Sequence, residues 1–266
     1  GSGVTLGAAL THPLTAATVL EISPEVVEAS RYFEKENHRA LSDRRTRLIV
    51  GDGRTHLMLG RETYDVIVSE PSNPWMAGIA SLFTREFFEG AKQRLAPGGV
   101  LCQWAHTYDI SSSDLRSIVS TFMSVFPNGT LWLIGDADVL LVGSTEPLDA
   151  RIGHIADAMT RPGVAADLAS VGVKSAFAVQ SLFIAQGDAL AAWAAGATIQ
   201  TDDRTDLEFT GPRSIFGSTR DDNAVALRTL AGTSPRPPAI AAALAAATPA
   251  DWRDRGLMHG QSEAFR

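Results

Sequence analysis

Glu70 and Asn73 are the residues of this chain whose position most clearly suggests chemistry. They lie in the segment 69–75 (SEPSNPW), directly after an apolar run, 65–68, that is typical of a buried parallel strand. Ligands of open α/β sheets bind beyond the carboxyl ends of the strands. Both side chains can accept a hydrogen bond from an amine, and the Glu70 carboxylate can also take its proton. The segment therefore predicts an enzyme that acts on nitrogen, with Glu70 as the base and Asn73 as a substrate ligand.

The residues around Glu70 bear on its acidity. Pro71, Pro74 and Trp75 are apolar neighbours, and we expect them to remove Glu70 partly from water, which favours proton uptake. The competing interpretation is a carboxylate that only caps the following helix. A cap does not require this Pro-rich and aromatic context, so we favour a catalytic role.

A second group of residues suggests a nucleoside site. Gly1 and Gly3 form a short glycine loop before a small-residue helix, and Glu21 and Ile22 end a strand predicted over 17–22. Glycine lets the backbone approach a ligand, and an acidic residue about 20 positions later accepts hydrogen bonds from ribose hydroxyls. We interpret these four residues as binding a nucleoside cosubstrate. The alternative is that Glu21 only caps the next helix.

Asp52 and Gly53 follow the next predicted strand, 48–50. Asp52 can accept a hydrogen bond from an adenine amino group, and Gly53 would let the ring lie against the backbone. Taken alone, the pair is more typical of a plain Asp-Gly turn. Because Glu21 and Glu70 end neighbouring strands, we expect the three carboxylates to line one crevice.

Polar and aromatic residues also follow the strand predicted over 99–104. Gln103 and Tyr108 are predicted to bind the substrate, with Trp104 and Tyr108 forming the walls of a pocket for an aliphatic amine. His106 is either a solvent-facing loop residue or a catalytic one. The acidic loop at Asp202 and Asp203 is either solvated or attracts a cationic substrate, and we include both residues among the substrate ligands.

The elements that position these residues belong to an α/β fold. Strand-like and helix-like segments alternate from residue 17 to residue 143, which predicts a Rossmann-like parallel sheet with helices on both faces. A terminal antiparallel hairpin, 131–142, is typical of S-adenosylmethionine-dependent transferases. Beyond residue 147 the pattern is helical and Ala-rich. We predict a transferase domain over 1–220, whose first strand is missing, and a helical appendage over 221–266.

Composition excludes several classes of protein. The formal net charge is −7 without a basic stripe, so we expect no nucleic-acid partner. Cys102 is the only cysteine and is interpreted as a core residue, and the histidines show no metal-binding spacing, so we expect no metal and no tightly bound cofactor. No apolar stretch reaches the ~20 residues that span a bilayer. We expect a soluble, cytoplasmic domain.

Several motifs together resemble the polyamine synthase (spermidine synthase-like) family. They are GSGVTLGAAL, VLEISPEVV, VGDGR, YDVIVSEPSNPW, LFTREFF and LAPGGVLCQW. A further, weaker match is TDDRTDLEF, later in the chain. The resemblance implies transfer of an aminopropyl group from decarboxylated S-adenosylmethionine to putrescine or a related amine, releasing methylthioadenosine. By position, Glu21 matches the ribose-binding acid and Asp52-Gly53 the adenine-binding pair. Glu70 matches the catalytic aspartate, and Gln103 matches a family glutamine.

The chain departs from the family pattern at three positions. Ser2 and Asn73 stand where the family usually has carboxylates, and Glu70 is one methylene longer than the usual aspartate. Each lost charge-assisted hydrogen bond is typically worth about 1.5–3 kcal/mol. Two alternatives therefore stay open. One is a methyl- or aminocarboxypropyl-transferase that uses intact S-adenosylmethionine, and the other is a non-catalytic domain that binds polyamine or nucleoside.

The sequence is most similar to a bacterial branch of this family in which the domain is fused to a membrane-embedded portion. The resemblance thus implies a longer protein tethered to the inner membrane. We also expect a homodimer.

Overall fold

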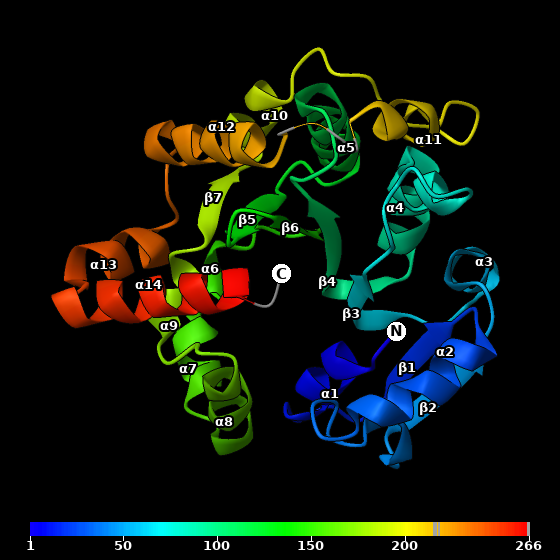
Figure 1. The fold of residues 1–266 in the computed structure, drawn as a ribbon, viewed down its shortest axis with the longest axis horizontal. Helices are drawn as coiled ribbons and strands as arrows, with labels where there is room; N and C mark the ends of the chain where they lie inside the picture. Colours follow the sequence, from blue (N-terminus) through cyan, green and yellow to red (C-terminus); the bar gives the residue numbers. More distant parts are fainter. Residues whose placement is uncertain (215–216, 218, 265–266) are drawn as a thin grey trace. The chain divides into compact units, whose positions relative to one another are not determined.

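The computed structural model describes residues 1–214, 217 and 219–264, shown as a ribbon in Figure 1. The chain forms two compact units. Unit 1 comprises Gly1–Gly60 and Ala156–Ser175, and unit 2 comprises Arg61–Ile155 and Ala176–Arg266. The predicted division into residues 1–220 and 221–266 stays a prediction.

Unit 1 contains a two-stranded parallel sheet, in which β1 (Ala17–Glu21) pairs with β2 (Thr46–Val50). Ser23 caps the helix after β1, because its Oγ accepts a hydrogen bond from Val26 N at 3.2 Å and Pro24 stands at the first helical position. The other helices of the unit are short. Its helical elements, with η for 3₁₀ turns, are α1 (Val4–Leu10), α2 (Pro24–Ala29), η1 (Ser30–Phe33), η2 (Ala40–Ser42), α3 (Gly53–Leu59), α7 (Ile155–Met159, whose first residue belongs to unit 2) and α8 (Pro162–Ser170).

Gly7 of α1 lies directly against the backbone at Asn37. A Cβ atom at residue 7 would lie 2.5 Å from the Asn37 carbonyl oxygen and 2.9 Å from its Cα. Asn37 is itself held, because its Nδ2 donates to Ser2 O at 2.8 Å and to Ser30 O at 3.0 Å. The approach of α1 to this segment therefore requires glycine.

The Gly7→Ala substitution is expected to destabilise unit 1 by roughly 1–3 kcal/mol through overpacking, despite the better helix propensity of alanine. Hydrogen exchange of the amides of β1 and β2 measures this change. Gly256→Ala is the matched control, because a Cβ there meets open space in the helix α14 (Pro249–Ala264). Equal protection in both variants would contradict the packing argument.

Unit 2 contains a five-stranded sheet of order β3-β4-β6-β5-β7. β3 (Tyr64–Ser69) and β4 (Leu95–His106) are parallel, and the remaining pairs are antiparallel. The predicted hairpin is confirmed as β5 (Thr130–Ile134) and β6 (Asp138–Ser144). An α/β fold with parallel strands and a terminal hairpin is thus confirmed. The prediction of helix alone beyond residue 147 was wrong at β7 (Phe183–Gln186), whose short apolar run pairs with β5.

The start of β4 also differs from the prediction. The strand was predicted over 99–104, but the helix α4 (Arg85–Gln93) ends early enough for β4 to begin at Leu95, so Pro97-Gly98-Gly99 lies within the strand. An irregular register accommodates it: Tyr64 pairs with Leu95, whereas Val66 pairs with Val100. Gly98 has a φ of 68°, a conformation that glycine adopts readily.

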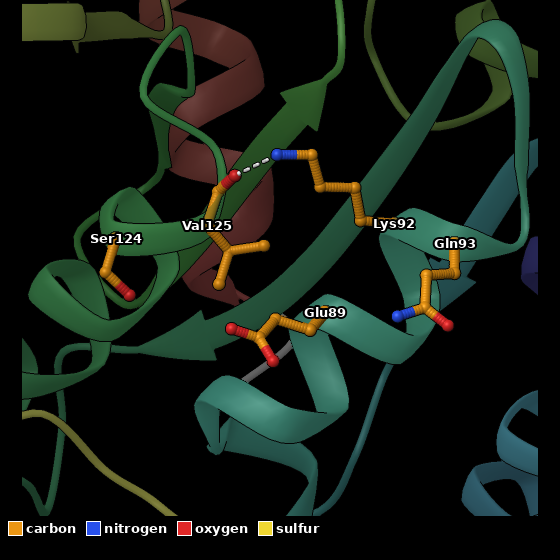
Figure 2. Close-up of a pocket in the computed structure, with 5 residues that line it drawn as sticks. All are labelled: Glu89, Lys92, Gln93, Ser124 and Val125. Atoms are coloured by element: carbon orange, nitrogen blue, oxygen red, sulfur yellow. Dashed lines mark hydrogen bonds between the residues drawn. The ribbon is translucent and has the colours of Figure 1, made fainter.

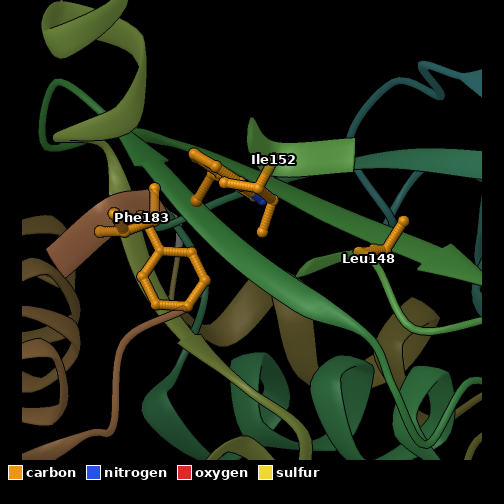
Figure 3. Packing of buried hydrophobic residues seen from close by; sticks show 5 residues of the cluster. Leu148, Ile152 and Phe183 are labelled. Atoms are coloured by element: carbon orange, nitrogen blue, oxygen red, sulfur yellow. The ribbon is translucent and has the colours of Figure 1, made fainter. Parts of the chain in front are cut away.

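Two layers of side chains hold the sheet of unit 2. Phenylalanines on α4 and on α5 (Ser112–Val125) are fully buried, and the Phe88 and Phe122 rings meet edge to face with centroids 5.3 Å apart. A second cluster, shown in Figure 3, joins the strands to helices: Trp132, Leu148, Ile152, Phe183 and Ile240. Ile240 belongs to the helix α13 (Pro238–Ala246), so this C-terminal helix packs into the core of unit 2.

The helical C-terminal region is confirmed, in orange and red in Figure 1. The helix α12 (Thr219–Thr233) packs against β7, and α14 packs against α9 (Ala176–Gln180). None of the helices in the described ranges combines the length and hydrophobicity that a bilayer-spanning segment needs. The helical elements of unit 2 not yet given are η3 (Ile79–Phe83), α6 (Asp149–Gly153), α10 (Gly187–Trp193), α11 (Asp206–Thr210) and η4 (Gly211–Arg213).

Candidate functional site

The predicted nucleoside residues all lie in unit 1. Gly3 caps α1 with a φ of 80°, which is left-handed and favours glycine. The amino group of Gly1 forms an ion pair with the carboxylate of Glu21, the last residue of β1. The glycine loop and Glu21 are therefore close together within unit 1.

Glu21 also binds the backbone of the helix that follows it. Its Oε1 accepts a hydrogen bond from Ser23 N at 3.1 Å. Burial alone would raise the pKa of Glu21, but the hydrogen bonds from the amino terminus and from Ser23 N–H outweigh it and lower the pKa below its usual value. Glu21 is thus an ionised acceptor at neutral pH. Ile22, next to it, is exposed.

Asp52 lies at the same edge of the sheet, because Glu21 pairs with Val50 and Gly51 N donates to Glu21 O at 2.9 Å. Its Oδ1 accepts from Thr55 N at 2.6 Å and caps α3, which begins at Gly53. Hydrogen bonds from the side chain and the backbone N–H of Thr55 lower the pKa of Asp52. The structure thus makes Asp52 a helix cap, and adenine binding stays a prediction.

The predicted catalytic residue, Glu70, lies in unit 2 directly after β3. Ser69 pairs with Gln103, so Glu70 stands beside the carboxyl end of β4. The expectation that Glu70 is partly buried was wrong: Pro71 and Pro74 are buried, but Glu70 is exposed. An exposed carboxylate at this edge can be reached by a substrate. The convergence of Glu70 with Glu21 and Asp52 stays a prediction, because it involves both units.

Cys102 shows which face of β4 is nearest to Glu70. Burial, and then the negative charge of Glu70, raise the pKa of the Cys102 thiol to about 12. The thiol is therefore protonated at neutral pH and is a poor nucleophile. Side chains alternate along a strand, so Trp104 and His106 share the face of Cys102.

Gln103 points to the opposite face. It is fully buried, like Leu101 and Ala105 on the same face of β4. Its Nε2 donates to Trp104 O at 3.1 Å, whereas its Oε1 has no hydrogen-bond partner among the described residues. Contact between Gln103 and a substrate stays a prediction.

His106 is not the solvent-facing loop residue that one interpretation of the sequence expected. It is the last residue of β4 and only 1% exposed. The rings of Trp75, Trp104 and Tyr108 surround it, with centroids 5.2, 5.3 and 4.4 Å from that of the imidazole. Burial lowers the pKa of His106 to about 4, although the hydrogen bond with the Tyr108 carbonyl opposes this shift. His106 is therefore neutral at pH 7.

The remaining predicted ligands lie in loops of unit 2. Asn73 is half-buried in the segment after Glu70, where its carbonyl accepts from Met76 N at 3.0 Å. Asp202 accepts from Thr84 Oγ1 at 2.8 Å, which ties the acidic loop to the residue that caps α4. Asp203 is exposed. Among the described residues, no group of three or more His, Cys, Asp or Glu side chains is placed to hold a metal ion.

A pocket elsewhere in unit 2 contains none of these residues. It has a volume of about 410 Å³ and is lined by Glu89, Lys92, Gln93, Ser124 and Val125, which Figure 2 shows between α4 and α5. Lys92 Nζ donates to Val125 O across it at 2.8 Å. α4 leads into the amino end of β4, whereas Glu70 and His106 lie at the carboxyl ends of the parallel strands. The pocket is thus separate from the candidate site.

The sequence is similar to those of curated proteins over about 130 residues. The chain is 29% identical over 129 residues to a spermidine synthase of Dictyostelium discoideum, covering 48% of this chain and 45% of the relative. It is 32% identical over 128 residues to putrescine N-methyltransferase 2 of Nicotiana tabacum, covering 47% and 36%. The chain thus spans less than half the length of these curated relatives.

The structural comparison concerns the fold alone. The crystal structure of a probable spermidine synthase from Corynebacterium glutamicum ATCC 13032 matches with a TM-score of 0.50 and 20% identity, over 76% of this chain and 70% of that chain. Over residues 1–134, half of the sequence, the chain matches the family model described as "Spermine/spermidine synthase domain". The chain therefore belongs to the spermine/spermidine synthase domain family.

Proposed function

We propose that this chain is a transferase domain that moves an aminopropyl group from decarboxylated S-adenosylmethionine to an amine of a di- or polyamine. The observation that carries the proposal is the position of Glu70. This chain belongs to the family, and its Glu70 side chain is exposed at the carboxyl end of the parallel β3–β4 pair. Glu70 also lies beside the face of β4 that carries Trp104 and His106. Ligands of such sheets bind at this edge.

In the proposed reaction the amine must first lose a proton, because an ammonium has no lone pair. Glu70 takes that proton, the nitrogen attacks the carbon beside the sulfonium, and the C–S bond breaks to release methylthioadenosine. Trp104 and Tyr108 contact the alkyl chain, and Asn73, Asp202 and Asp203 contribute polar contacts to the amine.

The nucleoside part of the donor is assigned to unit 1. Glu21 accepts hydrogen bonds from the ribose hydroxyls, and its ionised state suits this role. Asp52 accepts from the adenine amino group, while Gly53 and the exposed Ile22 lie against the base. Gly1 and Gly3 leave room for the backbone to approach the donor.

The similarity to putrescine N-methyltransferase favours a second candidate, in which intact S-adenosylmethionine is the donor. Ser2 is neutral and would tolerate the donor's carboxylate, and the product would be a methylated or aminocarboxypropylated amine. Loss of the carboxylates at residues 2 and 73 supports a third candidate, a domain that binds nucleoside or polyamine without turnover.

Calorimetry with S-adenosylmethionine, its decarboxylated form and methylthioadenosine separates these candidates, together with mass spectrometry of products formed from putrescine. We expect tighter binding of the decarboxylated donor and an aminopropylated product. Preference for the intact donor with a methylated or aminocarboxypropylated product would establish the second candidate. Binding without any product would establish the third.

Glu21→Ala is expected to weaken methylthioadenosine binding by about 10- to 100-fold, the effect of losing a charge-assisted hydrogen bond. Calorimetry of the variant measures this loss, and circular dichroism checks the fold. Glu28→Ala removes the same charge from an exposed ion pair of α2 and serves as the control. Equal affinities in the two variants would remove Glu21 from the donor site.

We further propose that the domain acts in a longer bacterial protein tethered to the inner membrane, with its soluble part in the cytoplasm, and that it forms a homodimer. Both proposals are supported only by the resemblance of the sequence to that branch of the family. Membrane fractionation of the full-length protein tests the first, and analytical ultracentrifugation of residues 1–266 tests the second.

A further inference from the structure

The tautomer of His106 follows from a single hydrogen bond. Nδ1 lies 2.6 Å from the backbone carbonyl oxygen of Tyr108. A carbonyl oxygen only accepts, so Nδ1 carries the proton and donates it, and in the neutral ring Nε2 then holds a lone pair. This Nε2 atom is buried and has no hydrogen-bond partner among the described residues. A buried acceptor without a donor is uncommon and requires an explanation.

The surroundings of this lone pair indicate what kind of donor it would accept. Trp75 meets the imidazole edge to face at an interplanar angle of 85°, and Tyr108 stacks on it at 22°. Trp104, on the same face of β4, is tilted at 43°. Aromatic faces attract alkylammonium groups and cover alkyl chains. A neutral nitrogen acceptor among three aromatic rings therefore suits the N–H end of an alkylamine.

We propose that His106 Nε2 accepts a hydrogen bond from an N–H group of the acceptor amine, and that this bond selects amines that carry an N–H. The inference rests on the proposed function and adds to it a neutral acceptor that could offset the loss of the carboxylate at Asn73. Because Nε2 is buried, the amine reaches it only if one of the surrounding rings moves, and we assign this movement to Trp75, which lies in the loop after β3.

Two variants separate this role from a structural one. In His106→Asn, the side-chain amide can still donate to Tyr108 O, but no acceptor remains at the position of Nε2. In His106→Gln, the longer side chain can place an oxygen acceptor near that position but loses the bond to Tyr108 O. A purely structural histidine would be replaced better by asparagine, whereas the proposed ligand would be replaced better by glutamine.

The test measures calorimetric binding of putrescine and of its bis(trimethylammonium) analogue, which has the same charge and chain length but no N–H. Wild-type protein is expected to bind putrescine, and His106→Asn to weaken this binding by about 10- to 100-fold, with His106→Gln losing less. Binding of the analogue should change little in either variant. The ¹⁵N resonance of His106 Nε2 should shift with putrescine and not with the analogue.

The outcomes distinguish failure of this inference from failure of the proposed function. Binding of putrescine by His106→Asn as tight as by wild type would overturn the role of His106 and leave the proposed transfer intact. That role is also overturned if both ligands are weakened equally, or if the ¹⁵N resonance does not respond to putrescine. Wild-type protein that neither binds putrescine nor forms a product from it would overturn both the inference and the proposed function.

Discussion

Replacement of Glu70 by glutamine is expected to lower the turnover number by about 10²–10⁴-fold, the usual contribution of a general base. Glutamine keeps the size of the side chain and its carbonyl oxygen, but it cannot take a proton from the attacking amine. Since the nucleoside is assigned to residues of unit 1, the affinity for methylthioadenosine should be largely unchanged. Steady-state kinetics with putrescine and calorimetry with methylthioadenosine measure the two effects separately.

Two further variants make this prediction specific. Glu70→Asp restores the shorter carboxylate of the family and should retain more activity than glutamine does. Glu89→Gln removes the same charge from the separate pocket between α4 and α5 and should leave the turnover number unchanged. Wild-type turnover in Glu70→Gln would remove Glu70 from the mechanism. Equal losses of turnover in Glu70→Gln and Glu70→Asp would show that the reaction depends on the exact side chain at residue 70 and not on its ability to accept a proton.

Unit 2 is expected to lose up to about 3 kcal/mol of stability as the pH falls from 6.5 to 4, because of His106. The ordinary pKa of histidine, 6.5, describes the unfolded chain, whereas burial lowers the pKa of His106 in the fold to about 4. Within this window the unfolded state binds a proton that the folded state does not. The contribution of His106 to the free energy of unfolding is therefore fully present above pH 6.5. It is lost as the pH falls toward 4.

Urea unfolding monitored by tryptophan fluorescence measures this dependence, because all five tryptophans lie in unit 2. His106→Asn should flatten the pH dependence in that window. Burial also lowers the pKa of His12 in unit 1, so the difference between wild type and His106→Asn isolates His106. Carboxylates with lowered pKa values, such as Asp52, lose their contribution to the free energy of unfolding only below the pH window of His106. Parallel curves for the two proteins would contradict the assignment.

The elements that position the candidate site were predicted from local pattern. The apolar run 65–68 before Glu70 lies within the strand Tyr64–Ser69. The hairpin and the glycine loop before α1 were predicted equally well, because alternation, glycine and proline act within a few residues of their position. Membership in the family likewise rests on motifs that can be read directly from the chain.

The tertiary structure decided which face of a strand each side chain takes and what covers it. Apolar residues occur on both faces of β4, so its sequence did not show which face is covered by the core. In the structure Gln103 points into the core, and Cys102 lies on the face nearest to Glu70. β7 was missed because its short run becomes a strand only by pairing with β5. Nor did any local pattern reveal that His106 is buried. Trp75, a residue of another segment, packs edge to face on the His106 ring, and burial lowers the pKa of His106. Its Nε2 has no hydrogen-bond partner in the part of the chain that the structure describes.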